Sequence, residues 1–99
     1  MTSARQQRAA VFLDAAARLV EEEPGLNVLD AFRRLRGSDE EIGDAYYALL
    51  HELESPQRHP WSLLAPWSDA ETSDRVAHRC RRAAKELRGE LRVIRRVGA

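Results

Sequence analysis

The stretch from Ser68 to Val97 constrains the fold more than any other part of the chain, because apolar residues recur along it at the spacing of one helical face. Successive members are separated by 4, 3, 4, 4 and 3 residues. At about 100° per residue, all of them fall on one narrow face of a helix. This seam consists of Val76, Cys80, Ala83, Leu87, Leu91 and Ile94. It predicts a long amphipathic helix that needs apolar cover along its length.

Local signals set the expected ends of this helix. Ser68 and Glu71 have the spacing of a capping box, which places the start at about residue 69. Gly89 lies inside the pattern and costs up to about 1 kcal/mol relative to alanine in a helix. Because the seam keeps its phase across Gly89, we expect one helix over about 69–97, with a break at Gly89 as the alternative. At ~1.5 Å per residue such a helix would be roughly 43 Å long.

A stripe of cations lies opposite the seam. This cationic stripe consists of Arg81, Lys85, Arg88, Arg92 and Arg96. Residues 75–99 contain nine Lys and Arg against two Glu, a net charge of +7, whereas residues 1–74 contain seven Arg against fourteen acids, a net charge of −7. The chain is neutral as a whole, but its charges are strongly separated along the sequence.

Shorter helices are predicted for the first half of the chain. Periodic apolar residues and turn signals indicate helices over about 4–23, 28–36 and 39–54. Thr2 or Ser3 can cap the first of these helices, and Gly37 is expected to close the second.

The segment 55–67 has a different character, and it completes the predicted architecture. The steps Ser55-Pro56 and His59-Pro60 disfavour helix in it, and it contains Trp61 and Trp67, so we expect an ordered connector that covers the open end of the core. The predicted fold class is therefore all-α. Residues 1–99 form a single helical domain, a small orthogonal bundle of four helices in which the C-terminal helix is the longest.

Composition excludes several classes of protein. The 99 residues are 43% hydrophobic and 32% charged, which is typical of one globular domain. No run of 18 apolar residues occurs, so we expect no membrane-spanning helix and no membrane partner. The polar start from Met1 to Arg8 argues against a signal peptide. Cys80 is the single cysteine, and a reducing cytoplasm is the expected location.

Residues that could carry catalysis or bind a metal are scarce. Cys80 belongs to the seam, which predicts a buried, unreactive thiol. His78 is two residues away and would face another direction on a helix. No CxxC, HExxH or glycine-rich phosphate loop is present. We therefore predict a non-enzymatic protein with no catalytic residue, metal site or cofactor, although a pocket containing His51 or His59 would favour an enzyme.

The favoured function is a protein–protein interaction module, either self-associating or an adaptor with a regulatory role. A 43 Å helix would be longer than the helices that cover it, so part of the seam would stay uncovered and could bind a second copy or an acidic foreign protein. The expected partner-binding residues are Leu91, Ile94, Trp61, Arg81, Lys85, Arg88, Arg92 and Arg96. The expected acidic counter-surface is Glu21, Glu22 and Glu23, which would meet arginines of the last helix or of a partner.

A nucleic-acid-binding regulator is the alternative, because arginines on one helical face can neutralise phosphates. Two observations weigh against it. The chain is neutral overall, whereas nucleic-acid-binding domains are usually basic. The helix predicted over 39–54 also begins with Asp39, Glu40 and Glu41, which would present anions to a DNA groove.

Two parts of the sequence have a more specific pattern: Trp-Ser-Asp-Ala-Glu-Thr-Ser-Asp-Arg-Val from Trp67 to Val76, followed by Arg-Arg-Ala-Ala-Lys-Glu-Leu, and Ala-Ala-Arg-Leu-Val-Glu of the first predicted helix. In these parts the chain resembles a family of small uncharacterised actinobacterial helical proteins. This chain has Ser68 where the family has Asn, and it lacks the family's central Trp-Cys segment. The resemblance implies an actinobacterial source and a cytoplasmic protein, and it implies no activity.

Overall fold

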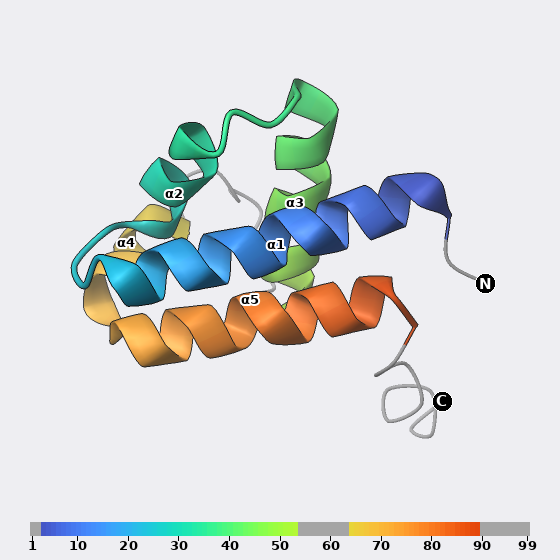
Figure 1. Ribbon diagram of the computed structural model, residues 1–99. Helices are drawn as coiled ribbons and strands as arrows, with labels where there is room; N and C mark the ends of the chain where they lie inside the picture. Colours follow the sequence, from blue (N-terminus) through green and yellow to red (C-terminus); the bar gives the residue numbers. More distant parts are fainter. Residues whose placement is uncertain (1–2, 54–63, 90–99) are drawn as a thin grey trace, which may run out of the picture.

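The computed structural model describes residues 3–53 and 64–89, of which about 80% are helical and none is in a strand. The helices of these ranges are α1 (Ala4–Glu22), α2 (Val28–Arg34), α3 (Asp39–Glu52), α4 (Leu64–Ala70) and α5 (Ser73–Leu87) (Figure 1). The predicted all-α class is confirmed, but the described part contains five helices where four were expected. No helix within it combines the length and the apolarity needed to cross a bilayer.

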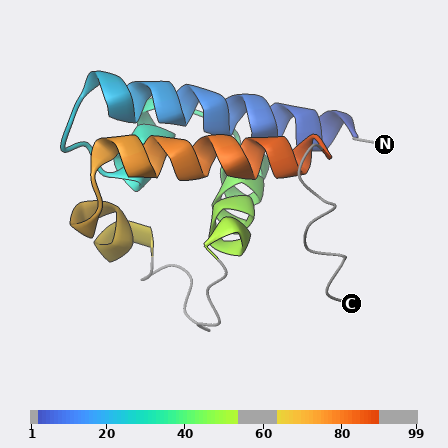
Figure 2. The same cartoon turned by 90° about the horizontal axis from the view of Figure 1, so that it is seen from below.

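The centre of the molecule is the pair formed by α1 and α5, which lie side by side and run in opposite directions (Figures 1 and 2). α3 packs across this pair, and α2 lies against both α1 and α4. Alanines dominate the contact surface, and small side chains let two helices approach closely. The fully buried alanines of the two central helices are Ala9, Ala10, Ala16 and Ala17 of α1 and Ala77, Ala83 and Ala84 of α5.

Most of the described part of the seam faces the core. Val76, Cys80 and Ala83 are at most 1% exposed, and Leu87 packs against the core from its edge. Burial raises the pKa of the Cys80 thiol to about 12. The prediction that Cys80 is buried is thus confirmed. Leu91 and Ile94 lie outside the described residues.

The last helix does not begin where the Ser68–Glu71 signal placed it. Ser68 belongs to α4, and its buried hydroxyl oxygen accepts a hydrogen bond of 2.9 Å from the N–H of Val28 at the start of α2. Thr72 caps α5 instead, since its hydroxyl accepts from the N–H of Arg75. The predicted connector 55–67 is also partly wrong, because residues 64–67 form the first turn of α4.

α5 ends at Leu87, so the expected unbroken helix is wrong and the alternative of a break at Gly89 holds, while residues 90–97 lie outside the described residues. Gly89 has φ +83°, and its N–H donates to the carbonyl of Glu86. A residue of this conformation just after a helix closes the last turn, and glycine adopts it without the cost that a Cβ brings. The described helix of 15 residues is therefore about 22 Å long, and α1, with 19 residues, is long enough to cover it.

Gly37 plays a different part from the one predicted. α2 ends at Arg34, and the positive φ that follows it belongs to Arg36, at +54°, and not to Gly37. Gly37 is instead a point of close approach, because a Cβ there would lie 2.5 Å from Cε1 of Phe12. The Phe12 ring is itself held in the core against Phe32, with ring centroids 5.4 Å apart.

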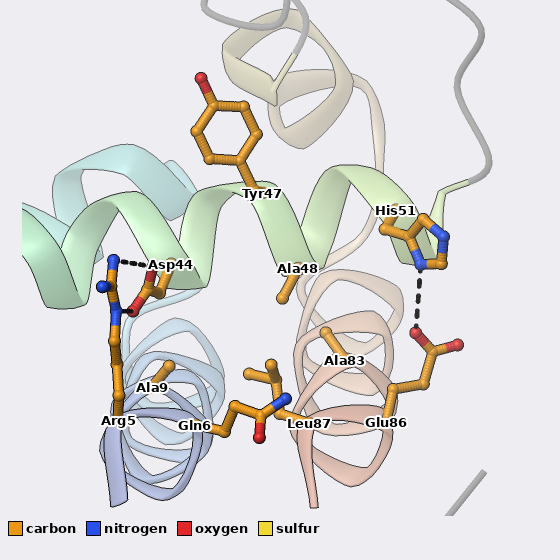
Figure 3. Close-up of a pocket in the computed structure, with 10 residues that line it drawn as sticks. All are labelled: Arg5, Gln6, Ala9, Asp44, Tyr47, Ala48, His51, Ala83, Glu86 and Leu87. Atoms are coloured by element: carbon orange, nitrogen blue, oxygen red, sulfur yellow. Dashed lines mark hydrogen bonds and ion pairs between the residues drawn. The ribbon is translucent and has the colours of Figure 1, made fainter. Parts of the chain in front are cut away.

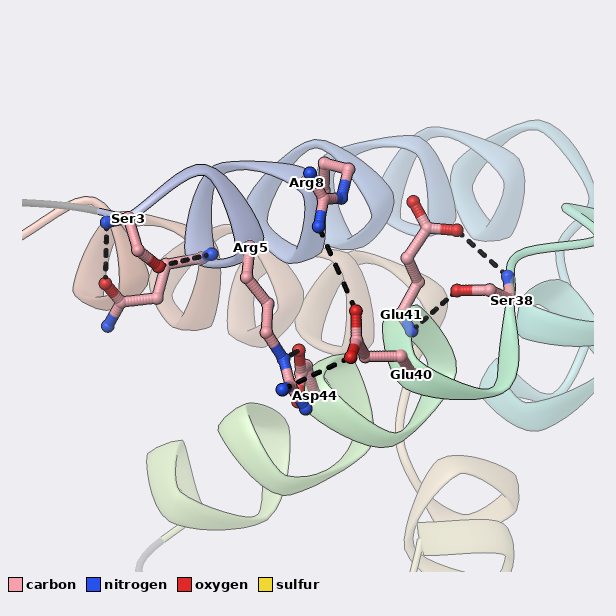
Figure 4. Close-up of polar contacts among 8 residues, drawn as sticks. Ser3, Arg5, Arg8, Ser38, Glu40, Glu41 and Asp44 are labelled. Carbon is pink, nitrogen blue, oxygen red and sulfur yellow. Dashed lines mark hydrogen bonds and ion pairs between the residues drawn. The ribbon is translucent and has the colours of Figure 1, made fainter.

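Two capping boxes fix the starts of α1 and α3 (Figure 4). The Ser3 hydroxyl accepts from the N–H of Gln6, whose side chain accepts from the N–H of Ser3. Ser38 and Glu41 make the same reciprocal pair, with distances of 3.1 and 2.9 Å. Each box satisfies two backbone donors that a helix start leaves without partners. The predicted start of α3 is confirmed, and Ser3 is the cap of α1.

Candidate functional site: a groove between three helices

An open groove of about 750 Å³ lies where α1, α3 and α5 meet (Figure 3). α1 contributes its first two turns, α3 the part from Asp44 to His51, and α5 its last turns. The lining residues are Arg5, Gln6, Ala9, Asp44, Tyr47, Ala48, His51, Ala83, Glu86 and Leu87. We refer to this site as the three-helix groove.

The inner part of the three-helix groove is apolar and made largely of alanines. Ala9 of α1 and Ala83 of α5 are fully buried, whereas Ala48 of α3 and Leu87 of α5 are partly exposed (Figure 3). Because three of these four side chains are single methyl groups, the helices approach at the floor and leave an unfilled hollow above it. Tyr47, 56% exposed, stands on the rim.

Charged pairs border the groove (Figure 3). The Arg5 guanidinium makes a two-pronged contact with Asp44, at 2.6 Å from Nε and 3.0 Å from Nη2. It also lies 3.2 Å from Glu40 (Figure 4), and the hydrogen bond to Asp44 raises the pKa of Arg5 above its ordinary value. On α3, one helical turn past Tyr47, His51 Nδ1 lies 3.5 Å from Oε1 of Glu86.

The groove contains His51, and a pocket with this residue is the observation that was expected to favour an enzyme. An imidazole beside a carboxylate can accept a proton. The ten lining residues nevertheless include no thiol and no serine or threonine hydroxyl. The Cys80 thiol is fully buried, and no group of three metal-ligating side chains lies together within residues 3–53 and 64–89. The lining of the groove is mainly apolar, with charged residues at its ends.

The structure corrects the expected orientation of the cationic stripe. Arg81 and Arg88 do not point away from the domain but bind acids of α1. Two N–H groups of Arg81 donate to Glu21, at 2.7 and 2.6 Å, and Arg88 donates to Asp14 at 2.6 Å. Lys85 is exposed. Arg92 and Arg96 lie outside the described residues, as does Trp61.

The predicted acidic counter-surface is divided among different contacts. Glu21 meets Arg81 of the last helix, as one of the two sequence interpretations proposed, and this hydrogen bond lowers the pKa of Glu21. Glu23 pairs with Arg34 of α2. Glu22 is exposed and makes no ion pair with the described part of the chain. Two of the three glutamates thus already pair with arginines of this chain.

The sequence pattern missed the residues that make the three-helix groove. Tyr47 and His51 lie four residues apart on the exposed side of α3, which is a weak signal for a shared surface. Ala48 and Glu86 gave no signal, because their role depends on how three helices meet. The buried Glu52 was also missed; its side chain is 3% exposed and pairs with Arg79 and Arg82 of α5.

Comparison with known proteins adds no family to this geometry: no family model matches the chain, and neither the curated proteins nor the solved structures that were searched contain a match.

Proposed function

We propose that this protein is a non-enzymatic protein–protein interaction module, self-associating or an adaptor, and that the three-helix groove receives an apolar segment of its partner. The observation that carries the proposal is the groove itself: a hollow of about 750 Å³ with an alanine floor, open to solvent. Grooves of this kind bind the apolar face of an amphipathic helix, whose side chains at i, i+3, i+4 and i+7 enter the hollow.

The polar ends of the groove would give the partner its orientation. Asp44 and Arg5 mark one side, and His51 and Glu86 mark another. Charged groups at the border of an interface contribute more to orientation and association rate than to affinity. Affinity would come from apolar side chains that fill the space above Ala48 and Ala83. The exposed Tyr47 ring is of the type that is enriched among the strongest contacts of interfaces.

The chain carries apolar segments of the required kind outside its described residues. Leu91 and Ile94 are separated by one helical turn in sequence, and basic residues surround them. We propose them, together with Trp61, as the anchors that a second copy offers to the groove. Arg81 and Arg88 are no longer proposed as direct partner contacts, because each already binds an acid of α1.

The same ion pairs weigh against the nucleic-acid alternative. Phosphate binding releases counterions from a surface whose cations are free to contact the backbone. Arg81 and Arg88, the arginines of the cationic stripe within the described residues, each pair with an acid of α1. A nucleic acid would have to displace those acids to gain the full benefit of the positive charge.

Sedimentation of the wild type and matched variants tests the proposal. Ala48→Arg fills the groove with a charged side chain and should raise the dissociation constant by about tenfold or more, which corresponds to roughly 1.4 kcal/mol. Ala70→Arg makes the same change on the exposed end of α4 and should leave association unchanged. Leu91→Asp should weaken association as Ala48→Arg does.

Two results would contradict the proposal. A wild type that is monomeric at every concentration and purifies without a partner would show that no association occurs. Equal weakening by Ala48→Arg and Ala70→Arg would show that association does not use the groove. Circular dichroism of each variant separates loss of binding from loss of helix.

A further inference from the structure

A second hollow, polar and smaller, lies on the outer side of α5. It has a volume of about 300 Å³ and is lined by Glu71, Arg75, His78, Arg79 and Arg82. The four basic residues occupy positions i, i+3, i+4 and i+7 of the helix, so they share one face. This α5 cleft is separate from the three-helix groove, with which it shares no lining residue.

Two arginines of the α5 cleft are held in place by a buried carboxylate of α3. The Glu52 side chain is 3% exposed, and its Oε2 accepts from Nη1 of Arg79 at 2.9 Å and from Nε of Arg82 at 3.0 Å. A buried carboxylate is costly unless it is paired, so both arginines are bound firmly to it. The other N–H groups of Arg79 and Arg82 make no hydrogen bond to the described part of the chain. Half of each guanidinium fork is thus fixed, and the other half is available.

The third arginine of the cleft is held loosely. Arg75 is 74% exposed, and its Nη1 lies 3.7 Å from Glu71, which is beyond hydrogen-bond distance. An exposed pair of this kind contributes little and can exchange partners. An anion entering the cleft would therefore meet two oriented guanidiniums and one adjustable guanidinium. The His78 imidazole and a single competing carboxylate, that of Glu71, complete the lining.

We propose that the α5 cleft binds a phosphomonoester group, the phosphate of a small phosphorylated molecule or of a modified side chain. Guanidinium forks match the oxygens of a phosphate with paired, charge-assisted hydrogen bonds. A phosphomonoester carries up to two negative charges at one point, which suits cations clustered in one cleft. A nucleic-acid backbone needs free cations along a track, and the neighbouring Arg81 and Arg88 are already bound to α1.

An NMR titration of the ¹⁵N-labelled protein tests the assignment, with inorganic phosphate and O-phosphoserine as probes and chloride at matched ionic strength as the reference. Saturable shifts of the Arg79 and Arg82 Nε–H signals are expected with both phosphate probes. Arg75→Gln should weaken binding by about threefold or more, because one charge-assisted contact is lost. Glu71→Gln should strengthen binding, because it removes the competing carboxylate.

The control is Arg33→Gln on α2, which removes another exposed arginine paired with a nearby acid of its own helix. It should not change phosphate binding. Equal effects of Arg33→Gln and Arg75→Gln, or shifts that chloride reproduces, would overturn the site. A short oligonucleotide that binds more tightly than O-phosphoserine would overturn the phosphomonoester assignment in favour of a nucleic acid. Arg79 and Arg82 are left unchanged, because replacing them would leave the buried Glu52 carboxylate without its ion-pair partners.

Discussion

At the scale of single residues, the contact between Gly37 and Phe12 sets a sharp limit on substitution. A Cβ on Gly37 would lie 2.5 Å from Cε1 of the Phe12 ring, which is 7% exposed and packed against Phe32. The ring cannot move aside without disturbing the core, so Gly37→Ala should lower the free energy of unfolding by about 1–3 kcal/mol. Chemical denaturation followed by circular dichroism measures this change.

Gly43 provides the matched control. It lies inside α3, and a Cβ there would meet no atom within 4 Å. Gly43→Ala should therefore stabilise the protein by up to about 1 kcal/mol, because alanine is the better helix former. The two substitutions add the same methyl group with opposite expected signs. A stabilising Gly37→Ala would show that Phe12 does not occupy the described position.

At the scale of elements, Gly89 decides whether the last helix stops or continues, and one substitution distinguishes the two. In a continuous helix, Gly89→Ala would stabilise by up to about 1 kcal/mol. At φ +83°, the same change puts a Cβ in the left-handed region and should destabilise by roughly 1–2 kcal/mol. We expect the destabilising result in a denaturation measurement, with Gly43→Ala as the reference for glycine within a helix. A stabilising effect of Gly89→Ala would instead support a helix that continues through Gly89.

The elements also show how far local sequence signals reach. The starts of α1, α2 and α3 were predictable, because Ser3, Asn27 and Ser38 cap the helices that directly follow them. Ser68 carries an equally good signal, but its hydroxyl is used by the N–H of Val28, forty residues away in sequence. A long-range hydrogen bond of this kind cannot be seen in local spacing, and Thr72 then takes the role of cap.

The candidate site was less predictable than the helices for a related reason. The exposed sides of Tyr47 and His51 follow from helical periodicity. The three-helix groove, however, exists only because alanines of α1, α3 and α5 meet at one point, and alanine gives no directional signal in sequence. The seam correctly indicated the buried face of α5 but could not indicate which part of its border would stay unfilled.

At the scale of the whole molecule, the separation of charge along the sequence becomes a set of contacts between helices. Arg81 of α5 pairs with Glu21 of α1, and Arg88, the C-cap of α5, pairs with Asp14 of α1. A second set joins Arg79 to Glu52 of α3. Within the described residues, arginines of α5 and its cap thus pair with acids of α1 and α3 inside one chain. At Glu21, whose pKa is lowered by the hydrogen bond from Arg81, this arrangement ties the stability of the fold to the ionisation of a carboxylate.

Glu21 makes this dependence measurable. Its hydrogen bond from Arg81 lowers its pKa below the ordinary value of 4.5, so the folded chain binds this proton less readily than the unfolded chain. The resulting stabilisation is complete above about pH 4.5 and is lost as the pH falls through the lowered pKa. Glu21→Gln should therefore be less stable than the wild type at pH 7, and the difference in unfolding midpoint should shrink toward zero below pH 4.

Glu22→Gln removes the adjacent exposed carboxylate, which makes no ion pair with the described helices, and should show no such convergence. A Glu21→Gln deficit that stays constant from pH 7 to pH 3 would mean that the contact between α1 and α5 does not depend on this charge.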